Sequence, residues 1–199
     1  MSDRAESFPL HRREVAKKIL DANDETLIVT GLGSTNWDFT AAGDCERIFP
    51  LWGAMGGCAG MGLGLALAQP GRRVIAATGD GEMLMGIGTL ATIAVKAPKN
   101  LTICIMDNER YGETGMQETH TATVTDLEMT AKGMGIQNVG TIRSEDDLAA
   151  QMDEIISGDG PVFRVIKVQA EPLPFILPSK DGVHLKNRMR RYLLGDSAL

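Results

Sequence analysis

Residues 73–81 read RVIAATGDG, an apolar run that ends in an aspartate between two glycines. Two other stretches share this arrangement: residues 26–34 read TLIVTGLGS, and residues 101–110 read LTICIMDNER. Apolar runs of this length are typical of strands covered on both faces, as in a parallel sheet. Because the carboxyl ends of parallel strands meet at one edge of the sheet, we expect the three polar ends to form one site.

Helical patterns separate the apolar runs. Residues 55–68 are rich in glycine and alanine, and residues 83–96 are apolar nearly all round, so each range predicts one helix. Further helices are expected to begin near Thr125 and at Ser144, where cap residues precede an apolar pattern. A last amphipathic helix is expected over residues 183–194.

A fourth apolar run, residues 161–168 (PVFRVIKV), predicts another strand. Arg164 and Lys167 interrupt this run, which favours a place nearer the edge of the sheet. The alternation of strands and helices predicts an α/β fold: a doubly wound, mostly parallel sheet with helices on both faces.

The 199 residues of the chain suffice for one sizeable core and are few for two full domains. We therefore expect a single domain over residues 1–199. Its ends are expected to be a helical arm at residues 1–25, and a Pro-rich segment with a C-terminal helix at residues 170–199. Glycine is over-represented at 23 residues, which suggests that the backbone closely approaches a ligand.

Composition excludes several classes of protein. The net charge is −6, which disfavours a nucleic-acid groove, because phosphate contacts need clustered Lys and Arg. No apolar run reaches the ~18 residues of a membrane span, and the first residues lack a signal-peptide pattern. Cys45, Cys58 and Cys104 lack CxxC spacing, which argues against a disulfide framework or a zinc site. A cytoplasmic location is the simplest expectation.

Asp80 and Asn108 are the best candidates for metal ligands. Each follows a predicted strand, and about two dozen residues separate them, enough for a helix and a returning strand. Carboxylate and amide oxygens suit Mg²⁺ or Ca²⁺, whose coordination phosphate oxygens often complete. Gly79 and Gly81 would let backbone N–H groups approach an anion at the start of the following helix.

A GDG followed, about two dozen residues later, by an asparagine after an apolar strand resembles the signature of thiamine diphosphate enzymes. The resemblance implies the diphosphate-binding (PP) domain of that superfamily, with thiamine diphosphate and Mg²⁺ as cofactors. It implies that Asp80, the Asn108 side chain and the backbone carbonyl of Arg110 ligate Mg²⁺. Gly81 and Glu82 would present N–H groups to the diphosphate. Glu82 is a departure, since this position is often small or hydroxylic, and its carboxylate is expected to point away from the phosphates.

A second segment, residues 51–56 (LWGAMG), is similar to the superfamily segment that holds the aminopyrimidine ring. The resemblance implies that Met55 supports the bent cofactor from below. It also implies that the Gly53 carbonyl and the Met55 N–H bind the ring. The full set of expected cofactor-binding residues is Gly33, Ser34, Gly53, Met55, Gly79, Asp80, Gly81, Glu82, Asn108, Tyr111 and Gly112.

A third segment, residues 107–119 (DNERYGETGMQET), resembles the pattern of sulfopyruvate and phosphonopyruvate decarboxylases, and the overall resemblance covers about residues 26–168. It implies a lyase that releases CO₂ and an aldehyde from a 2-oxo acid with a sulfonate or phosphonate at C3. Thr114 and Gln117 are candidates for the substrate pocket. His120 is a candidate catalytic residue that could bind an anion or relay a proton, although a surface histidine is the more ordinary interpretation.

Catalysis in this superfamily also needs a glutamate from a second domain of about this chain's length, and only 25 residues precede the first predicted strand. The chain therefore resembles the separate β subunit of a split decarboxylase. The resemblance implies an α subunit that supplies the activating glutamate, in a hetero-oligomer of α2β2 or larger. No activating catalytic residue is assigned within this chain.

Other functions remain open at this point. Within the same cofactor class, the chain could belong to a carboligase similar to acetolactate synthase. A β subunit of a 2-oxoacid:ferredoxin oxidoreductase is disfavoured, because no cysteine cluster accompanies the GDG. A nucleotide-binding module using residues 60–64 (GMGLG) lacks the GxGxxG spacing and falls inside a predicted helix. A non-catalytic cofactor-binding protein is the remaining alternative.

Overall fold

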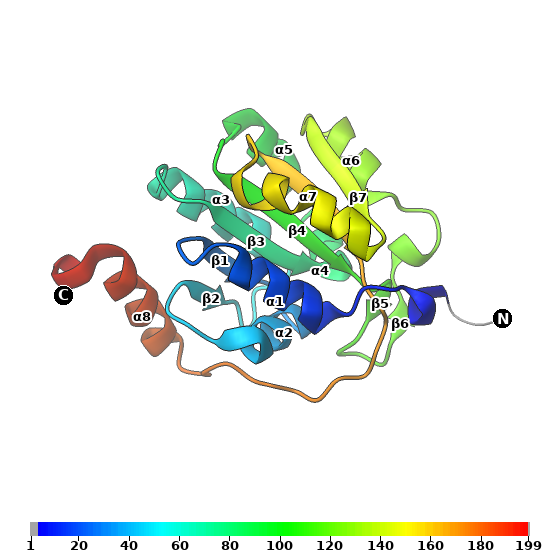
Figure 1. Ribbon diagram of the computed structural model, residues 1–199, viewed down its shortest axis with the longest axis horizontal. Coiled ribbons are helices and arrows are strands. Elements are labelled where there is room, and N and C mark those ends of the chain that lie inside the picture. Colours follow the sequence, from blue (N-terminus) through cyan, green and yellow to red (C-terminus); the bar gives the residue numbers. More distant parts are fainter. Residues whose placement is uncertain (1–3, 199) are drawn as a thin grey trace.

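The computed structural model describes residues 4–198, whose centre is a parallel sheet between two layers of helices (Figure 1). The strand order is β2-β1-β3-β4-β8-β7, and every neighbouring pair is parallel. The predicted fold class is therefore confirmed. The six strands are β1 (Leu27–Thr30), β2 (Ile48–Pro50), β3 (Val74–Gly79), β4 (Leu101–Asp107), β7 (Asn138–Ile142) and β8 (Val162–Lys167).

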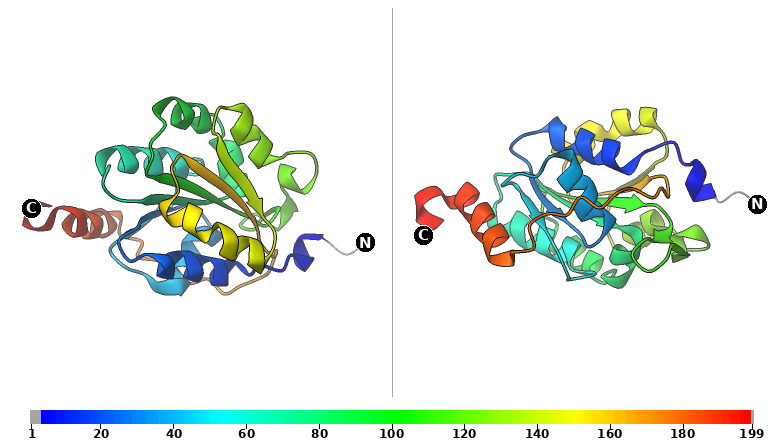
Figure 2. Two further views of the ribbon diagram at one scale, coloured as in Figure 1. Left: turned by 45° about the horizontal axis from the view of Figure 1, so that its top comes forward. Right: turned by 90° about the horizontal axis from the view of Figure 1, so that it is seen from below.

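Helices cover both faces of the sheet (Figure 2). Each face has its own apolar core. One face packs against α1 (Arg12–Ala22), α2 (Ser34–Gly43) and α7 (Glu145–Ser157). The other packs against α3 (Cys58–Ala68), α5 (Thr89–Lys96) and α6 (Leu127–Gly133). Successive strand residues point to opposite faces, so Val29 joins one core and Ile28 the other. This explains why the strands are apolar at nearly every position.

The prediction of one helix over residues 83–96 is wrong. The segment forms α4 (Asp80–Met85) and α5, with a break at residues 86–88. The sequence there is Gly-Ile-Gly, and two glycines within three residues are unfavourable in a helix interior. The α4 helix starts three residues earlier than the predicted helix, directly at the end of β3, and Asp80 and Gly81 form its first turn.

As predicted, residues 161–168 lie nearer the edge of the sheet than β3 and β4 do, but β8 is an interior strand, paired with β4 on one side and with β7 on the other. Its two charged residues are buried with partners on the neighbouring strands. Arg164 Nη2 donates to Asn138 Oδ1 at 2.8 Å, and Lys167 Nζ donates to Asp107 Oδ2 at 2.6 Å. The sheet ends at β7 on this side and at β2 on the other, and the sequence pattern identified neither edge strand.

Several predicted ends of helices are confirmed. The α6 helix is capped by Asp126, which accepts from Met129 N, and α7 is capped by Ser144, which accepts from Asp147 N. The final helix, α8 (Gly182–Leu194), agrees closely with prediction. The α3 helix begins at Cys58 rather than at Met55. The remaining short elements are η1 (Arg4–Ser7), β5 (Arg110–Tyr111), β6 (Gln117–Glu118), η2 (His120–Ala122) and η3 (Gly195–Ala198).

The order of the strands creates a crevice at the carboxyl edge of the sheet. After β1 the chain enters α2 on one face, whereas after β3 it enters α4, whose Met83 belongs to the core on the other face. Connections that leave adjacent strands in opposite directions open a crevice where ligands bind in α/β sheets. Among residues 4–198, no helix has the length and apolar character needed to cross a membrane.

Candidate functional site

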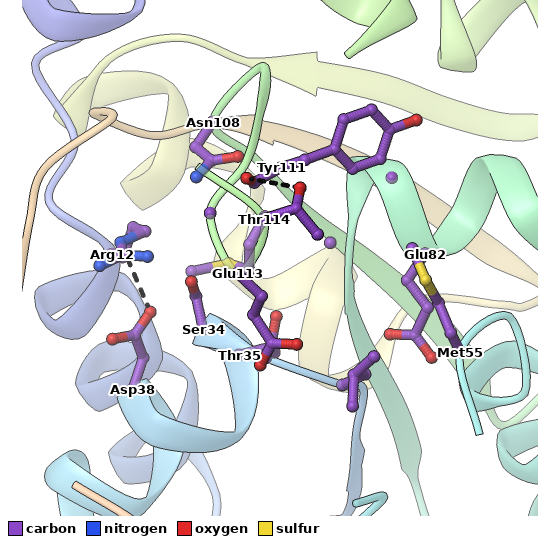
Figure 3. Close-up of a pocket in the computed structure, with 16 residues that line it drawn as sticks. Arg12, Ser34, Thr35, Asp38, Met55, Glu82, Asn108, Tyr111, Glu113 and Thr114 are labelled. Carbon is purple, nitrogen blue, oxygen red and sulfur yellow. Dashed lines mark hydrogen bonds and ion pairs between the residues drawn. The ribbon is translucent and has the colours of Figure 1, made fainter. Parts of the chain in front are cut away.

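One pocket lies at this crevice, and all three predicted loops contribute to its wall (Figure 3). The three polar strand ends therefore lie together, as expected. The pocket is lined from the predicted set by Gly33, Ser34, Met55, Gly79, Gly81, Glu82, Asn108, Tyr111, Gly112 and Thr114. Its other lining residues are Arg12, Leu32, Thr35, Asp38, Met106 and Glu113.

Asp80 lies at the start of α4 between the pocket-lining residues Gly79 and Gly81; it is 2% exposed and does not itself line the pocket. Burial raises the pKa of its carboxyl group to about 7, and the nearby charge of Asp107 adds to the rise. Thr119 Oγ1 donates to Asp80 Oδ2 at 2.5 Å and Thr121 Oγ1 donates to the same atom at 3.1 Å, which opposes the rise. Asp80 is thus oriented by hydroxyl groups and is not paired with a cationic side chain among the described residues.

The two threonines are part of the site that sequence reasoning missed. Thr121 Oγ1 also lies 2.8 Å from Asp107 Oδ1, so its one hydroxyl proton is shared between the two carboxylates, which connects the ends of β3 and β4. Asp107 is in turn paired with Lys167 of β8. Thr119 ends the DN-to-T segment quoted above, but nothing in its local sequence indicates that it contacts Asp80.

Asn108 lies directly after β4 and is 7% exposed. Its Oδ1 accepts from the backbone N–H of Arg110 at 3.1 Å, which closes a turn of the kind that asparagine favours. Glu109, in the left-handed region at φ +58°, is held by Arg4 and Lys167. Burial opposes the ionisation of Glu109, but the hydrogen bonds from Arg4 and Lys167 outweigh it and lower the pKa. The loop that presents Asn108 and Arg110 is therefore firmly positioned.

Gly81 has no room for a side chain. A Cβ atom at this position would lie 2.4 Å from Cε1 of Tyr111. The ring of Tyr111 thus packs directly against the first turn of α4, and both residues line the pocket. The close approach explains why the residue after Asp80 is glycine.

Glu82 is buried, at 4% exposed, and its carboxyl group is turned toward the end of β3. Thr78 Oγ1 donates to Glu82 Oε2 at 2.5 Å, whereas Oε1 has no hydrogen-bond partner among the described residues. Burial raises the pKa of Glu82. The hydrogen bond from Thr78 and the nearby backbone N–H groups of Cys58, Gly56 and Leu32 oppose part of this rise. The carboxyl group therefore lies among the loops that follow β1, β2 and β3.

The other candidates differ in their relation to the pocket. Met55 is 38% exposed on the pocket wall, whereas Gly53 is exposed and lies outside the lining set. Thr114 lines the pocket, whereas Gln117 is exposed and does not line it. The two residues are joined by two hydrogen bonds of 2.8 Å: Thr114 Oγ1 donates to Gln117 Oε1, and Gln117 Nε2 donates to the Thr114 carbonyl. His120 is exposed at the start of η2 and does not line the pocket.

The donor set fits a Mg²⁺-bound diphosphate. No group of three His, Cys, Asp or Glu side chains suited to a metal ion occurs within residues 4–198. A cation site here would therefore combine the Asp80 carboxylate with amide and main-chain carbonyl oxygens, which are the hard donors that Mg²⁺ prefers. Asp80 is buried and has no cationic side chain paired with it among the described residues, and a bound cation would neutralise its carboxylate.

Comparison with known proteins identifies a family. The family model of the thiamine pyrophosphate enzyme C-terminal TPP-binding domain matches residues 35–166. The chain is 38% identical over 160 residues to a protein named sulfopyruvate decarboxylase subunit beta from Methanothermobacter thermautotrophicus. That match covers 80% of this chain and 83% of the subunit.

Longer proteins also match. The chain is 39% identical over 136 residues to a phosphonopyruvate decarboxylase from Streptomyces hygroscopicus, with 68% of this chain and 33% of that protein covered. A solved structure described as a thiamin diphosphate-dependent enzyme from Mycobacterium smegmatis superposes with a TM-score of 0.69 at 23% identity. The superposition covers 82% of this chain and 32% of the Mycobacterium smegmatis chain, and it supports the assigned fold.

Proposed function

The chain belongs to the thiamine pyrophosphate enzymes, as a cofactor-binding domain of their decarboxylases, and we propose that it is the β subunit of a decarboxylase for 3-sulfo- or 3-phosphono-substituted 2-oxo acids. The observation that carries the proposal is the 38% identity to a sulfopyruvate decarboxylase β subunit over 83% of that subunit's length. The products would be CO₂ and an aldehyde.

Residues on the pocket wall, together with neighbouring residues that do not line it, would hold the cofactor. Asp80, the Asn108 side chain and the Arg110 backbone carbonyl would ligate Mg²⁺, because they combine one charged and two neutral hard oxygen donors. The loop at Gly33 and Ser34 and the N–H groups of Gly81 and Glu82 would bind the diphosphate. Support comes from the pocket wall, where Ser34, Gly81, Glu82 and Asn108 lie together.

When bound, thiamine diphosphate supplies the electron sink that a 2-oxo acid needs in order to lose CO₂. The role of this chain is to bind and orient the reacting partners. The Met55 side chain would support the rings, while the Gly53 carbonyl and the Met55 N–H would hold the aminopyrimidine. Residues 111–114, with Tyr111 against α4 and Thr114 on the pocket wall, would help to exclude water.

We propose that activity requires an α subunit that provides the activating glutamate, in a hetero-oligomer of α2β2 or larger. The name of the 38% identical relative, a subunit beta, supports a partner. Glu82 is the one buried glutamate on the pocket wall, but it is engaged by Thr78 beneath the loops. We expect this chain alone to bind the cofactor weakly and to turn over no substrate.

The substrate class is tested by assaying sulfopyruvate, phosphonopyruvate and pyruvate side by side. The chain would be co-expressed with the subunit encoded by the neighbouring reading frame, and aldehyde and CO₂ would be measured with Mg²⁺ and thiamine diphosphate. We expect kcat/KM for one of the anionic substrates to exceed that for pyruvate by roughly 10- to 100-fold, since a charge-assisted contact contributes about 1.5–3 kcal/mol.

Each alternative has its own outcome in this assay. Equal rates on all three substrates would overturn the anion-specific assignment. A 2-hydroxyketone product in place of the aldehyde would identify a carboligase. Robust turnover by the pure chain would contradict the requirement for a partner, and the chain without its partner is the control for background activity.

A further inference from the structure

Arg12 is a buried cation on the pocket wall, and the proposed function assigns it no role. It lies in the first turn of α1, is 5% exposed, and lines the same pocket as Ser34 and Asn108. Figure 3 shows Arg12 and Asp38 on one side of the pocket, with Met55 and Glu82 on the opposite side. A buried arginine is uncommon unless other groups satisfy its charge and its N–H donors.

The protein leaves most of those donors without a partner. A guanidinium carries five N–H donors. Among the described residues Arg12 makes one hydrogen bond, from Nη2 to the Glu171 carbonyl oxygen at 3.2 Å. Its Nε lies 3.6 Å from Asp38 Oδ2, which is close enough for an ion pair but beyond hydrogen-bond range, and both atoms are buried without a hydrogen-bond partner.

The charges around Arg12 show how it is held in place. Asp38 is shared between two arginines, because Arg13 Nε donates to Asp38 Oδ1 at 3.3 Å. Burial raises the pKa of Asp38, and the two arginines oppose this rise. The carboxylate of Glu171 is itself paired with His11 at 3.2 Å. Asp38 therefore anchors Arg12 without saturating it.

The position along the pocket indicates which ligand group Arg12 would meet. Met55, at the other side, is the residue expected to support the reactive rings, so the substrate would react there. A diphosphate attached to those rings would reach the other side of the pocket, where Figure 3 shows Arg12 on the same side as Ser34 and Asn108. Phosphate oxygens that do not coordinate Mg²⁺ need other hydrogen-bond donors. The planar guanidinium of arginine suits them, because it can donate two parallel N–H bonds to a phosphate.

We propose that Arg12 binds the terminal phosphate of thiamine diphosphate; this inference rests on the proposed cofactor site. It adds to that site a cation from α1, an element outside the region matched by the family model. Arg12 would then confer selectivity for the diphosphate over the monophosphate form of the cofactor.

The test is a comparison of two ligands and three variants of the full chain. Affinities for thiamine diphosphate and for thiamine monophosphate, each with saturating Mg²⁺, are measured by titration calorimetry. We expect Arg12→Met to reduce the ratio of the two affinities by roughly 10- to 100-fold, because a charge-assisted contact to the terminal phosphate is lost. Arg12→Lys keeps the positive charge but loses the paired N–H donors of the guanidinium, and we expect a smaller reduction of the ratio, roughly 3- to 10-fold.

Arg13→Met is the matched control. Arg13 is the next residue of α1 and also pairs with Asp38, but it does not line the pocket. We expect its ratio of affinities to stay within about two-fold of wild type, because a partly exposed charge that does not line the pocket should contribute little to the contact with the terminal phosphate. Because the readout is a ratio on one protein, a general loss of stability cancels.

The outcomes separate the two proposals. An unchanged ratio in both Arg12 variants, with wild type still preferring the diphosphate, would overturn the role of Arg12 and leave the cofactor site standing. An equal reduction in Arg13→Met would also overturn it, because the effect would then come from net charge. If wild-type chain bound neither ligand even with its partner subunit, the proposed cofactor site itself would fail.

Discussion

Asp80→Asn is expected to weaken binding of Mg²⁺ and thiamine diphosphate by roughly 100-fold or more, and to stabilise the ligand-free chain. Removing an outer-shell partner of a metal ligand already costs 10- to 100-fold, and Asp80 would be the charged ligand itself. Asparagine keeps an acceptor for Thr119 and Thr121, whose hydroxyls donate to Asp80 Oδ2 at 2.5 and 3.1 Å. Binding is measured by titration calorimetry, and turnover in the complex should fall with it.

The gain in stability should depend on pH in a defined direction. The carboxyl of Asp80 has a pKa of about 7 in the folded chain, raised from 3.8 by burial and by Asp107. Between these values the folded chain holds a proton that the unfolded chain has lost, so the stability of wild type falls as pH rises from about 4 to about 7. Asparagine does not ionise, so the variant does not lose stability in this way as pH rises. We therefore expect Asp80→Asn to be more stable than wild type by roughly 1–3 kcal/mol at pH 8, and by less at pH 5.

Asp159→Asn serves as the matched control for this pair of measurements. It makes the same change at a side chain that is 87% exposed, far from the pocket wall. We expect its effect on urea unfolding to stay within about 0.5 kcal/mol at either pH. Wild-type cofactor affinity in Asp80→Asn would exclude Asp80 as a metal ligand. A variant less stable than wild type at pH 8 would show that the buried charge is compensated within the protein.

The parts of the site that lie on strand ends could be predicted from sequence. Buried parallel strands have a distinctive composition, and the chain direction then places Gly79 and Met106 side by side, as the register of β3 and β4 confirms. Asp80 follows Gly79 directly, and Asn108 follows Met106 after one residue, Asp107. No comparable local signal marks β2 or β7, which are short or only partly buried.

Side chains whose role depends on distant segments could not be predicted. Arg164 and Lys167 suggest an exposed strand, but partners on β7 and after β4 allow both to be buried. Arg12 reaches the pocket only because α1 packs beside α2, and Glu82 turns inward only because the loop at Gly31 leaves room for it. Such contacts join residues from different segments, so no window of sequence contains them.

Gly31→Ala is expected to destabilise the chain by roughly 1–3 kcal/mol, the usual cost of overpacking a filled interior. A Cβ atom at Gly31 would lie 1.7 Å from Glu82 Oε2 and 2.9 Å from Thr78 Oγ1. The Glu82 carboxyl would have to leave its hydrogen bond with Thr78 and move within a packed interior, since the residue is 4% exposed. The free energy of unfolding is measured by urea titration, and cofactor affinity should fall because this loop leads to Ser34.

A double-mutant cycle tests whether the contact with Glu82 causes the loss of stability in Gly31→Ala. Glu82→Ala alone removes the bond with Thr78 and should cost about 1–2 kcal/mol. In the double variant the added methyl enters the space that the carboxyl vacated, so we expect the two losses to be less than additive by at least about 1 kcal/mol. Gly64→Ala, an exposed helix position with nothing within 4 Å of the added Cβ, should instead be neutral or stabilising by up to about 1 kcal/mol. Strictly additive losses would mean that the Glu82 carboxyl can move away without cost. In that case the tight contact at Gly31 would not be what keeps this position free of a side chain.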